Sequence, residues 1–124
     1  DNCVVSFNEL MTYITAPTHA GDKIDVSDIF SNILLLFHEL VEICELKKMG
    51  LKITNDIILS YPEKCYEAHY VAIREELKLA REMGNVSWIQ ARLRDVKSYL
   101  SDPDLPKSLE SKFISLLKDF SNNL

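Results

Sequence analysis

The sequence predicts an all-α protein: an antiparallel up-and-down helical bundle of four main helices plus one or two short helices, forming a single domain over residues 1–124. Three observations predict it. Apolar residues recur at steps of three and four, the period of an amphipathic helix. Helix-start and helix-stop residues bracket these stretches. The composition, 47% hydrophobic with 3 Gly and 4 Pro, suits one compact globular domain and excludes a disordered or collagen-like chain.

Residues 6–15 are predicted to form the first helix. Ser6 and Glu9 stand three residues apart, the spacing of a capping box in which each side chain bonds the other residue's backbone N–H. Apolar residues follow at helical spacing, and Pro17 ends the pattern because proline cannot continue a helix. We expect this short helix to cover the bundle rather than to be one of its four main members.

The second helix is expected to be long and central. It is predicted to start at Asp25 or Ser27, to continue without a break to Met49 and to stop at Gly50. Its apolar residues lie on more than one face, which is typical of a helix surrounded by neighbours.

A short helical segment is predicted within residues 51–60, and the longest helix of the chain follows it. Ser60 and Glu63 have the spacing of a second capping box, and Pro62 falls in the first turn, where its missing N–H does no harm. The long helix is expected to end at Gly84, since glycine readily adopts the left-handed conformation that closes a helix.

Two further helices complete the predicted bundle. Asn85 is expected to cap the first of them, which ends before Pro103, and Pro106 opens the second. The connection around Gly84 is so short that the helices before and after it should lie antiparallel as a hairpin. The chain shows no convincing strand pattern.

Acidic residues are concentrated in the first third of the chain. Residues 1–45 carry eight acids and one base, a net charge of −7, whereas residues 46–124 carry +2. Nucleic-acid binding draws much of its affinity from basic residues that neutralise phosphates, so the overall charge of −5 argues against a nucleic-acid partner. An acidic surface favours fast encounter with a basic protein instead.

Neither membrane insertion nor a disulfide scaffold is expected. The longest unbroken apolar run, residues 33–37, is far shorter than the roughly 20 residues that span a bilayer. Cys44 and Cys65 fall in apolar helical patterns, where a free thiol acts as a small hydrophobic group, and this favours a reducing, cytoplasmic location. Against that location stands the glycosylation sequon at residues 85–87, although it coincides with a helix start.

Cys65 and His69 are the best candidates for metal ligands, because a spacing of four places both side chains on one face of a helix. Zinc needs three or four ligands, and the others would have to converge from Cys44, His38, Glu42 or Glu67. His38 and Glu42 are also one turn apart, but the Glu-x-x-His pairs of di-iron bundles are missing. We therefore expect no metal and no cofactor.

Catalytic motifs are also missing from the sequence. It contains no strand-turn-helix nucleophile elbow, no Gly-rich phosphate loop and no local context typical of a catalytic cysteine. We therefore expect no catalytic residues and no enzymatic activity.

The predicted function is protein–protein interaction: an acidic helical module that binds a basic partner as an inhibitor, immunity protein, adaptor or effector. The expected contact residues are acids of the first third together with the single tryptophan: Asp25, Asp28, Glu39, Glu42 and Trp88. Trp88 is large enough to anchor an interface, and its alternative role is a lid over the end of the core.

Two other functions remain open. The first is a small metal- or ligand-binding helical enzyme with a cavity near His38, Cys65, His69 and Tyr66. The second is a secreted cytokine-like bundle, suggested by the chain's size, its sequon and its start at Asp1.

Overall fold

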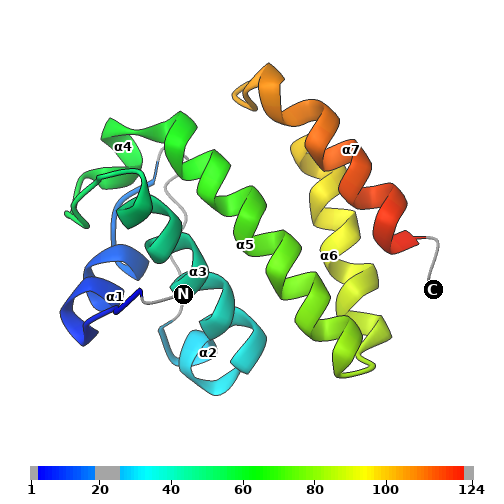
Figure 1. The fold of residues 1–124 in the computed structure, drawn as a ribbon, viewed down its shortest axis with the longest axis horizontal. Coiled ribbons are helices and arrows are strands. Elements are labelled where there is room, and N and C mark those ends of the chain that lie inside the picture. The colour runs from blue at the N-terminus through cyan, green and yellow to red at the C-terminus, as the bar shows by residue number, and fades with distance from the viewer. Residues whose placement is uncertain (1–2, 19–25, 122–124) are drawn as a thin grey trace.

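The computed structural model describes residues 3–18 and 26–121, and this part of the chain is helical without any strand (Figure 1). Its helices are α1 (Phe7–Ile14), α2 (Val26–Ser31), α3 (Ile33–Lys48), α4 (Ile57–Ser60), α5 (Pro62–Glu82), α6 (Val86–Tyr99) and α7 (Lys107–Ser121). The predicted all-α class is confirmed. Among the helices described, none combines the length and apolar character needed to cross a bilayer.

Three predicted helix boundaries are confirmed in atomic detail. Ser6 Oγ accepts a hydrogen bond from the Glu9 N–H at 3.1 Å, and the Ser6 N–H donates to Glu9 Oε1 at 2.9 Å, so the capping box forms. Gly84 ends α5 with a φ of +69°, a conformation that favours glycine. Asn85 then caps α6, because its side-chain oxygen accepts from the Trp88 N–H at 3.1 Å.

The continuous helix expected from Asp25 or Ser27 to Met49 is wrong, because Asn32 divides it into α2 and α3. The backbone of Asn32 is extended, and its side-chain oxygen accepts hydrogen bonds from the N–H groups of Leu34 and Leu35 at 2.9 and 3.3 Å. A short polar side chain that bonds nearby backbone donors competes with the helix and starts a new one.

The second capping box is also wrong. Tyr61 occupies the cap position of α5 without a side-chain hydrogen bond, and the Ser60 hydroxyl donates to Asp56 at 3.2 Å instead of capping. The helical segment predicted within residues 51–60 is confined to α4.

Helices α3 and α5 form the most extensive helix pair. In Figure 1, α5 crosses the middle of the molecule, with α1 to α4 on one side and α6 and α7 on the other. Both α6 and α7 pack against α5, and α1 and α2 pack against α3. The α3–α5 pair is thus the scaffold to which the other helices attach.

The buried apolar side chains form two clusters. One joins the start of α3 and the second half of α5 to α6, α7 and the turn between them: Leu34, Ile73, Leu77, Ala80, Ile89, Leu93, Val96, Leu105, Leu109, Phe113, Leu116 and Phe120. The other joins the end of α3 and the start of α5 to α1, α2 and α4: Leu10, Tyr13, Ile14, Ile29, Ile43, Leu46, Ile57, Cys65 and Ala68. The antiparallel α3–α5 pair therefore contributes opposite ends to each cluster, and its middle lies between them.

Cys44 is not the free thiol that was expected, because it forms a disulfide with Cys3 across a Cα–Cα distance of 5.9 Å. The bond ties the segment before α1 to α3. Disulfides persist mainly in oxidising compartments, so this bond speaks against the reducing, cytoplasmic location that the sequence predicted. Cys65 is a buried free cysteine, as expected.

The Cys65 thiol is expected to resist alkylation in the native protein. Burial, together with the charge of Glu42, raises the pKa of this thiol to about 12. At pH 8 its reactive thiolate is therefore roughly a thousandfold scarcer than that of an exposed cysteine. Iodoacetamide followed by mass spectrometry should label no cysteine in the native protein and Cys65 alone after denaturation without reductant. Labelling of Cys3 or Cys44 under those conditions would argue against the disulfide.

Candidate functional site

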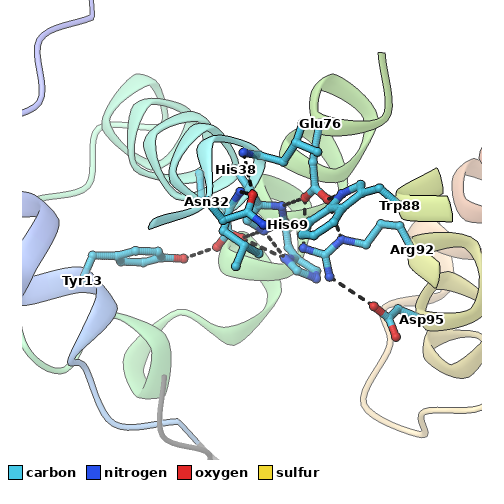
Figure 2. A network of polar contacts seen from close by, with 11 residues as sticks. Tyr13, Asn32, His38, His69, Glu76, Trp88, Arg92 and Asp95 are labelled. Carbon is cyan, nitrogen blue, oxygen red and sulfur yellow. Dashed lines mark hydrogen bonds and ion pairs between the residues drawn. The ribbon is translucent and has the colours of Figure 1, made fainter. Parts of the chain in front are cut away.

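Charged side chains fill the middle of the α3–α5 pair, between the two apolar clusters (Figure 2). His38 and Glu42 lie one turn apart on α3, and His69 and Glu76 face them from α5. His38, Glu42 and Glu76 are only 3%, 7% and 0% exposed. Ionisable groups are rarely buried to this extent unless partners satisfy them.

Three atoms of these side chains converge on one point. His69 Nδ1 lies 2.8 Å from Glu42 Oε2 and 3.1 Å from His38 Nε2, and the same Glu42 oxygen is hydrogen-bonded to His38 Nε2. We call this set of His38, Glu42 and His69 the ligand triangle. Imidazole nitrogens and carboxylate oxygens are the ligands that zinc and other transition metals take from proteins.

Glu76 and its partners hold His38 from the other side of the ring. His38 Nδ1 and Glu76 Oε1 are 2.7 Å apart, and the ring nitrogen is the donor. Glu76 also accepts two hydrogen bonds from the Arg92 guanidinium, at 2.9 and 3.0 Å, and one from the Trp88 indole N–H at 2.6 Å. Helix α6 thus fixes Glu76, and Glu76 fixes the orientation of the His38 ring.

Glu42 is positioned by a residue from α1. The Tyr13 hydroxyl donates to Glu42 Oε1, which leaves Oε2 to face the two histidines. Tyr13 is itself buried in the second apolar cluster, so the position of its hydroxyl depends on how α1 packs against α3.

Attraction between the opposite charges of the histidines, glutamates and Arg92 offsets the cost of burying them. Burial lowers the pKa of His38, but Glu42 and Glu76 outweigh this effect and raise it to about 9. Burial likewise raises the pKa of Glu42, yet His38 and His69 hold it well below its usual range. The pKa of Glu76 is also lowered, because His38 and Arg92 outweigh its burial. Both carboxylates therefore stay ionised inside the protein.

A pocket of about 830 Å³ adjoins the ligand triangle. Glu42 and His69 line it, together with Tyr66 and Tyr99 and the acidic Asp102. A volume of this size suits a small-molecule ligand. The triangle is therefore buried on the side of Glu76 and accessible on the side of the pocket.

The structure places the five predicted contact residues in different environments. Glu42 is buried in the ligand triangle, and the half-buried Trp88 directs its indole N–H to Glu76. Asp28 is exposed on α2, Glu39 is half-buried on α3, and Asp25 lies outside the described residues. Glu42 and Trp88 thus belong to the inner network and not to an exposed acidic face.

Cys65 and His69, the candidate ligand pair of the sequence analysis, make different contacts in the fold. The Cys65 thiol points to the backbone oxygen of Ile57 at 3.8 Å, whereas His69 joins His38 and Glu42. Sequence reasoning missed the remaining members of the network altogether: Tyr13, Glu76 and Arg92.

Comparison of the chain with protein-family models, with curated proteins and with solved structures finds no significant match. A fold alone does not define a function, which depends on the chemistry of the site.

Proposed function

We propose that the protein binds a divalent transition metal ion, with zinc the best fit, through His38 Nε2, His69 Nδ1 and Glu42 Oε2. The observation that carries the proposal is the convergence of these three atoms, which all lie within 4.8 Å of one another, beside a pocket. Two histidines and one glutamate are a ligand set of catalytic zinc sites, which keep a further position for water or substrate.

The spacing of the triangle is close to what zinc requires. Two ligands bound to tetrahedral zinc, each at about 2.0–2.1 Å, lie about 3.3 Å apart. His38 Nε2 and His69 Nδ1 are 3.1 Å apart. Glu42 Oε2 lies nearer to both nitrogens, 2.8 Å from His69 Nδ1 and closer still to His38 Nε2, so its carboxylate has to move away from both rings to admit the ion.

The surroundings of His38 also fit a metal ligand. A metal-binding histidine typically donates its second ring N–H to a carboxylate, which fixes the tautomer and makes the free nitrogen more basic. Glu76 occupies that position, held by Arg92 and Trp88. Without a metal, protonated His38 and Arg92 balance the charges of Glu42 and Glu76, so a bound ion would take the place of the proton on His38 Nε2.

The pocket supports a reactive ion rather than a purely structural one. Glu42 and His69 belong to the ligand triangle and also line the pocket, so a small molecule in the pocket could reach the ion. Zinc with a free position polarises a bound oxygen or activates a water molecule, which is the chemistry of hydrolytic zinc sites.

Zinc titration of the EDTA-treated full chain tests the proposal. Calorimetry and native mass spectrometry should find one zinc ion per chain. Free zinc at about 100 times its Kd should raise the free energy of unfolding by about 2.7 kcal/mol, because the ion binds only the folded chain.

His69→Ala is the decisive variant, because the His69 side chain is 25% exposed and its loss should leave the chain folded. It should lose both zinc binding and zinc-dependent stabilisation. Glu67→Ala, an exposed acid on the same helix, is the matched control and should bind zinc like the wild type. Wild-type protein that retains no zinc, or His69→Ala protein that binds it undiminished, would show that the triangle is only an ion-pair network.

The interaction with a basic partner, predicted from the charge distribution, stays a prediction. Among the acids predicted for that surface, Asp28 is exposed and Glu39 is half-buried in the described chain. The Cys3–Cys44 disulfide favours an oxidising compartment as the place of action for either function.

A further inference from the structure

The pocket beside the ligand triangle has aromatic walls. The Tyr66 and Tyr99 rings have centroids 6.4 Å apart and an interplanar angle of 83°. The His69 ring meets them at 74° and 66°, with centroid distances of 6.4 and 5.3 Å. The face of a tyrosine ring carries negative electrostatic potential, so a positively charged group that lies over the face of either tyrosine is attracted to it.

The charged side chains around the pocket are acidic, apart from His69, which pairs with Glu42. The described lining of the pocket contains no lysine or arginine. Four carboxylates line it: Glu42, Glu63, Asp102 and Asp104. Asp102 is held in place, because its Oδ1 accepts the Asp104 N–H at 2.9 Å and its Oδ2 accepts the Tyr66 hydroxyl at 2.7 Å. These hydrogen bonds also lower the pKa of Asp102, which keeps it ionised. An anionic ligand would meet repulsion here, and a cation would meet attraction.

The hydroxyl of Thr18 lies beside the same pocket without a partner. Thr18 is a half-buried residue that lines the pocket, whereas its Oγ1 has almost no accessible surface and no hydrogen-bond partner within the described residues. Buried hydroxyl groups almost always have a partner, so a small rotation of this side chain toward the pocket would let a polar group of a ligand satisfy it.

We propose that the pocket binds a small organic cation, with an alkylammonium or quaternary ammonium group placed against Tyr66 and Tyr99 and near Asp102. Aromatic faces combined with carboxylates are the chemistry that recognises such groups. The volume of about 830 Å³ leaves room for a further polar portion of the same molecule, which could reach Thr18. This site does not depend on the proposed metal ion, although the two share one pocket.

Choline and its uncharged isostere 3,3-dimethylbutan-1-ol form a matched pair of probes, because they have nearly the same shape and differ in charge. Their binding to the EDTA-treated full chain can be measured by calorimetry or by ligand-observed NMR. Choline should bind at least about tenfold more tightly than the isostere, since only choline gains the cation–π and carboxylate attraction.

Asp102→Asn and Asp104→Asn should each weaken choline binding several-fold and leave binding of the isostere unchanged. Two variants are used because Asp102 also accepts hydrogen bonds within its own turn, whereas Asp104 is exposed. Glu110→Gln on α7, an exposed acid outside the pocket, is the matched control.

The proposal is overturned if choline fails to bind, if the isostere binds as tightly, or if both aspartate variants bind choline like the wild type. Zinc binding is measured separately. A chain that binds zinc but not choline would contradict the proposed organic-cation site and support the proposed metal site. A chain that binds choline but not zinc would support the organic-cation site and contradict the metal site.

Discussion

Replacing Arg92 by alanine is expected to lower the free energy of unfolding by about 3–5 kcal/mol. The Arg92 guanidinium donates two hydrogen bonds to Glu76, whose side chain is completely buried. Without Arg92, Glu76 keeps only His38 and Trp88 as partners, and a negative charge stays in the interior with too little compensation. Urea unfolding of the EDTA-treated protein, followed by circular dichroism, measures the loss.

Two further variants separate the charge of Arg92 from its geometry. Arg92→Lys keeps the positive charge but cannot donate two parallel hydrogen bonds, so it should lose less stability than Arg92→Ala. Arg94→Ala removes an exposed arginine from the same helix and should change the stability by no more than about 0.5 kcal/mol. If Arg92→Ala were no more harmful than Arg94→Ala, the buried network would not be a stabilising part of the fold.

Removing the Cys3–Cys44 disulfide is expected to lower the free energy of unfolding by about 4 kcal/mol. The bond links residues 41 positions apart, and the chain-entropy relation for a closed loop of that length gives this magnitude. It also holds the segment before α1 against α3, and α1 carries the Tyr13 hydroxyl that orients Glu42. Guanidinium unfolding with and without dithiothreitol measures the effect.

The double variant Cys3→Ser/Cys44→Ser provides the control for the reductant. Its stability should match that of the reduced wild type and should not respond to dithiothreitol, since its only cysteine is Cys65. Equal stability of the oxidised and reduced wild-type chains would contradict the predicted role of the bond.

Some helix boundaries with local signals could be predicted from the sequence, and others, such as the capping box expected at Ser60, could not. The caps at Ser6 and Asn85 depend on side chains that bond the backbone within three residues, and the end of α5 at Gly84 depends on the positive φ that glycine allows. Asn32 carries the same kind of side chain, but the sequence around it continues the apolar helical pattern on both sides. Whether such an asparagine caps a helix or points to solvent depends on how α2 and α3 pack.

The members of the ligand triangle were visible in the sequence, but their convergence was not. The spacing of His38 and Glu42 places them on one face of a helix, and His69 lies on another helix. Which faces meet depends on the register of α3 against α5, a long-range property that no local pattern encodes. The contact of Tyr13 with Glu42 could not be predicted for the same reason, because Tyr13 lies on α1 and the contact depends on how α1 packs against α3.

The burial of Glu76, in contrast, is indicated by the sequence pattern of α5. His69, Ile73, Glu76 and Ala80 follow one another at steps of four, three and four, so they share one stripe of α5. A histidine and a glutamate that continue an apolar stripe have to be buried with partners, and such a pattern marks a polar site inside a helical core. The disulfide left no comparable signal, because Cys3 precedes the first helix and three cysteines do not indicate which two pair.

The division of the interior into two apolar clusters has a consequence for α5. One end of this helix must point its small and apolar side chains toward α1 and α4, and the other end must point them toward α6 and α7. Each residue added to a helix turns everything beyond it by about 100°. One residue inserted between Ala68 and Ile73 would therefore rotate one end of α5 by about 100° relative to the other. If one end then packed correctly in its cluster, the apolar side chains of the other end would point away from theirs. The packing of α5 into both clusters therefore constrains the number of residues between its two ends.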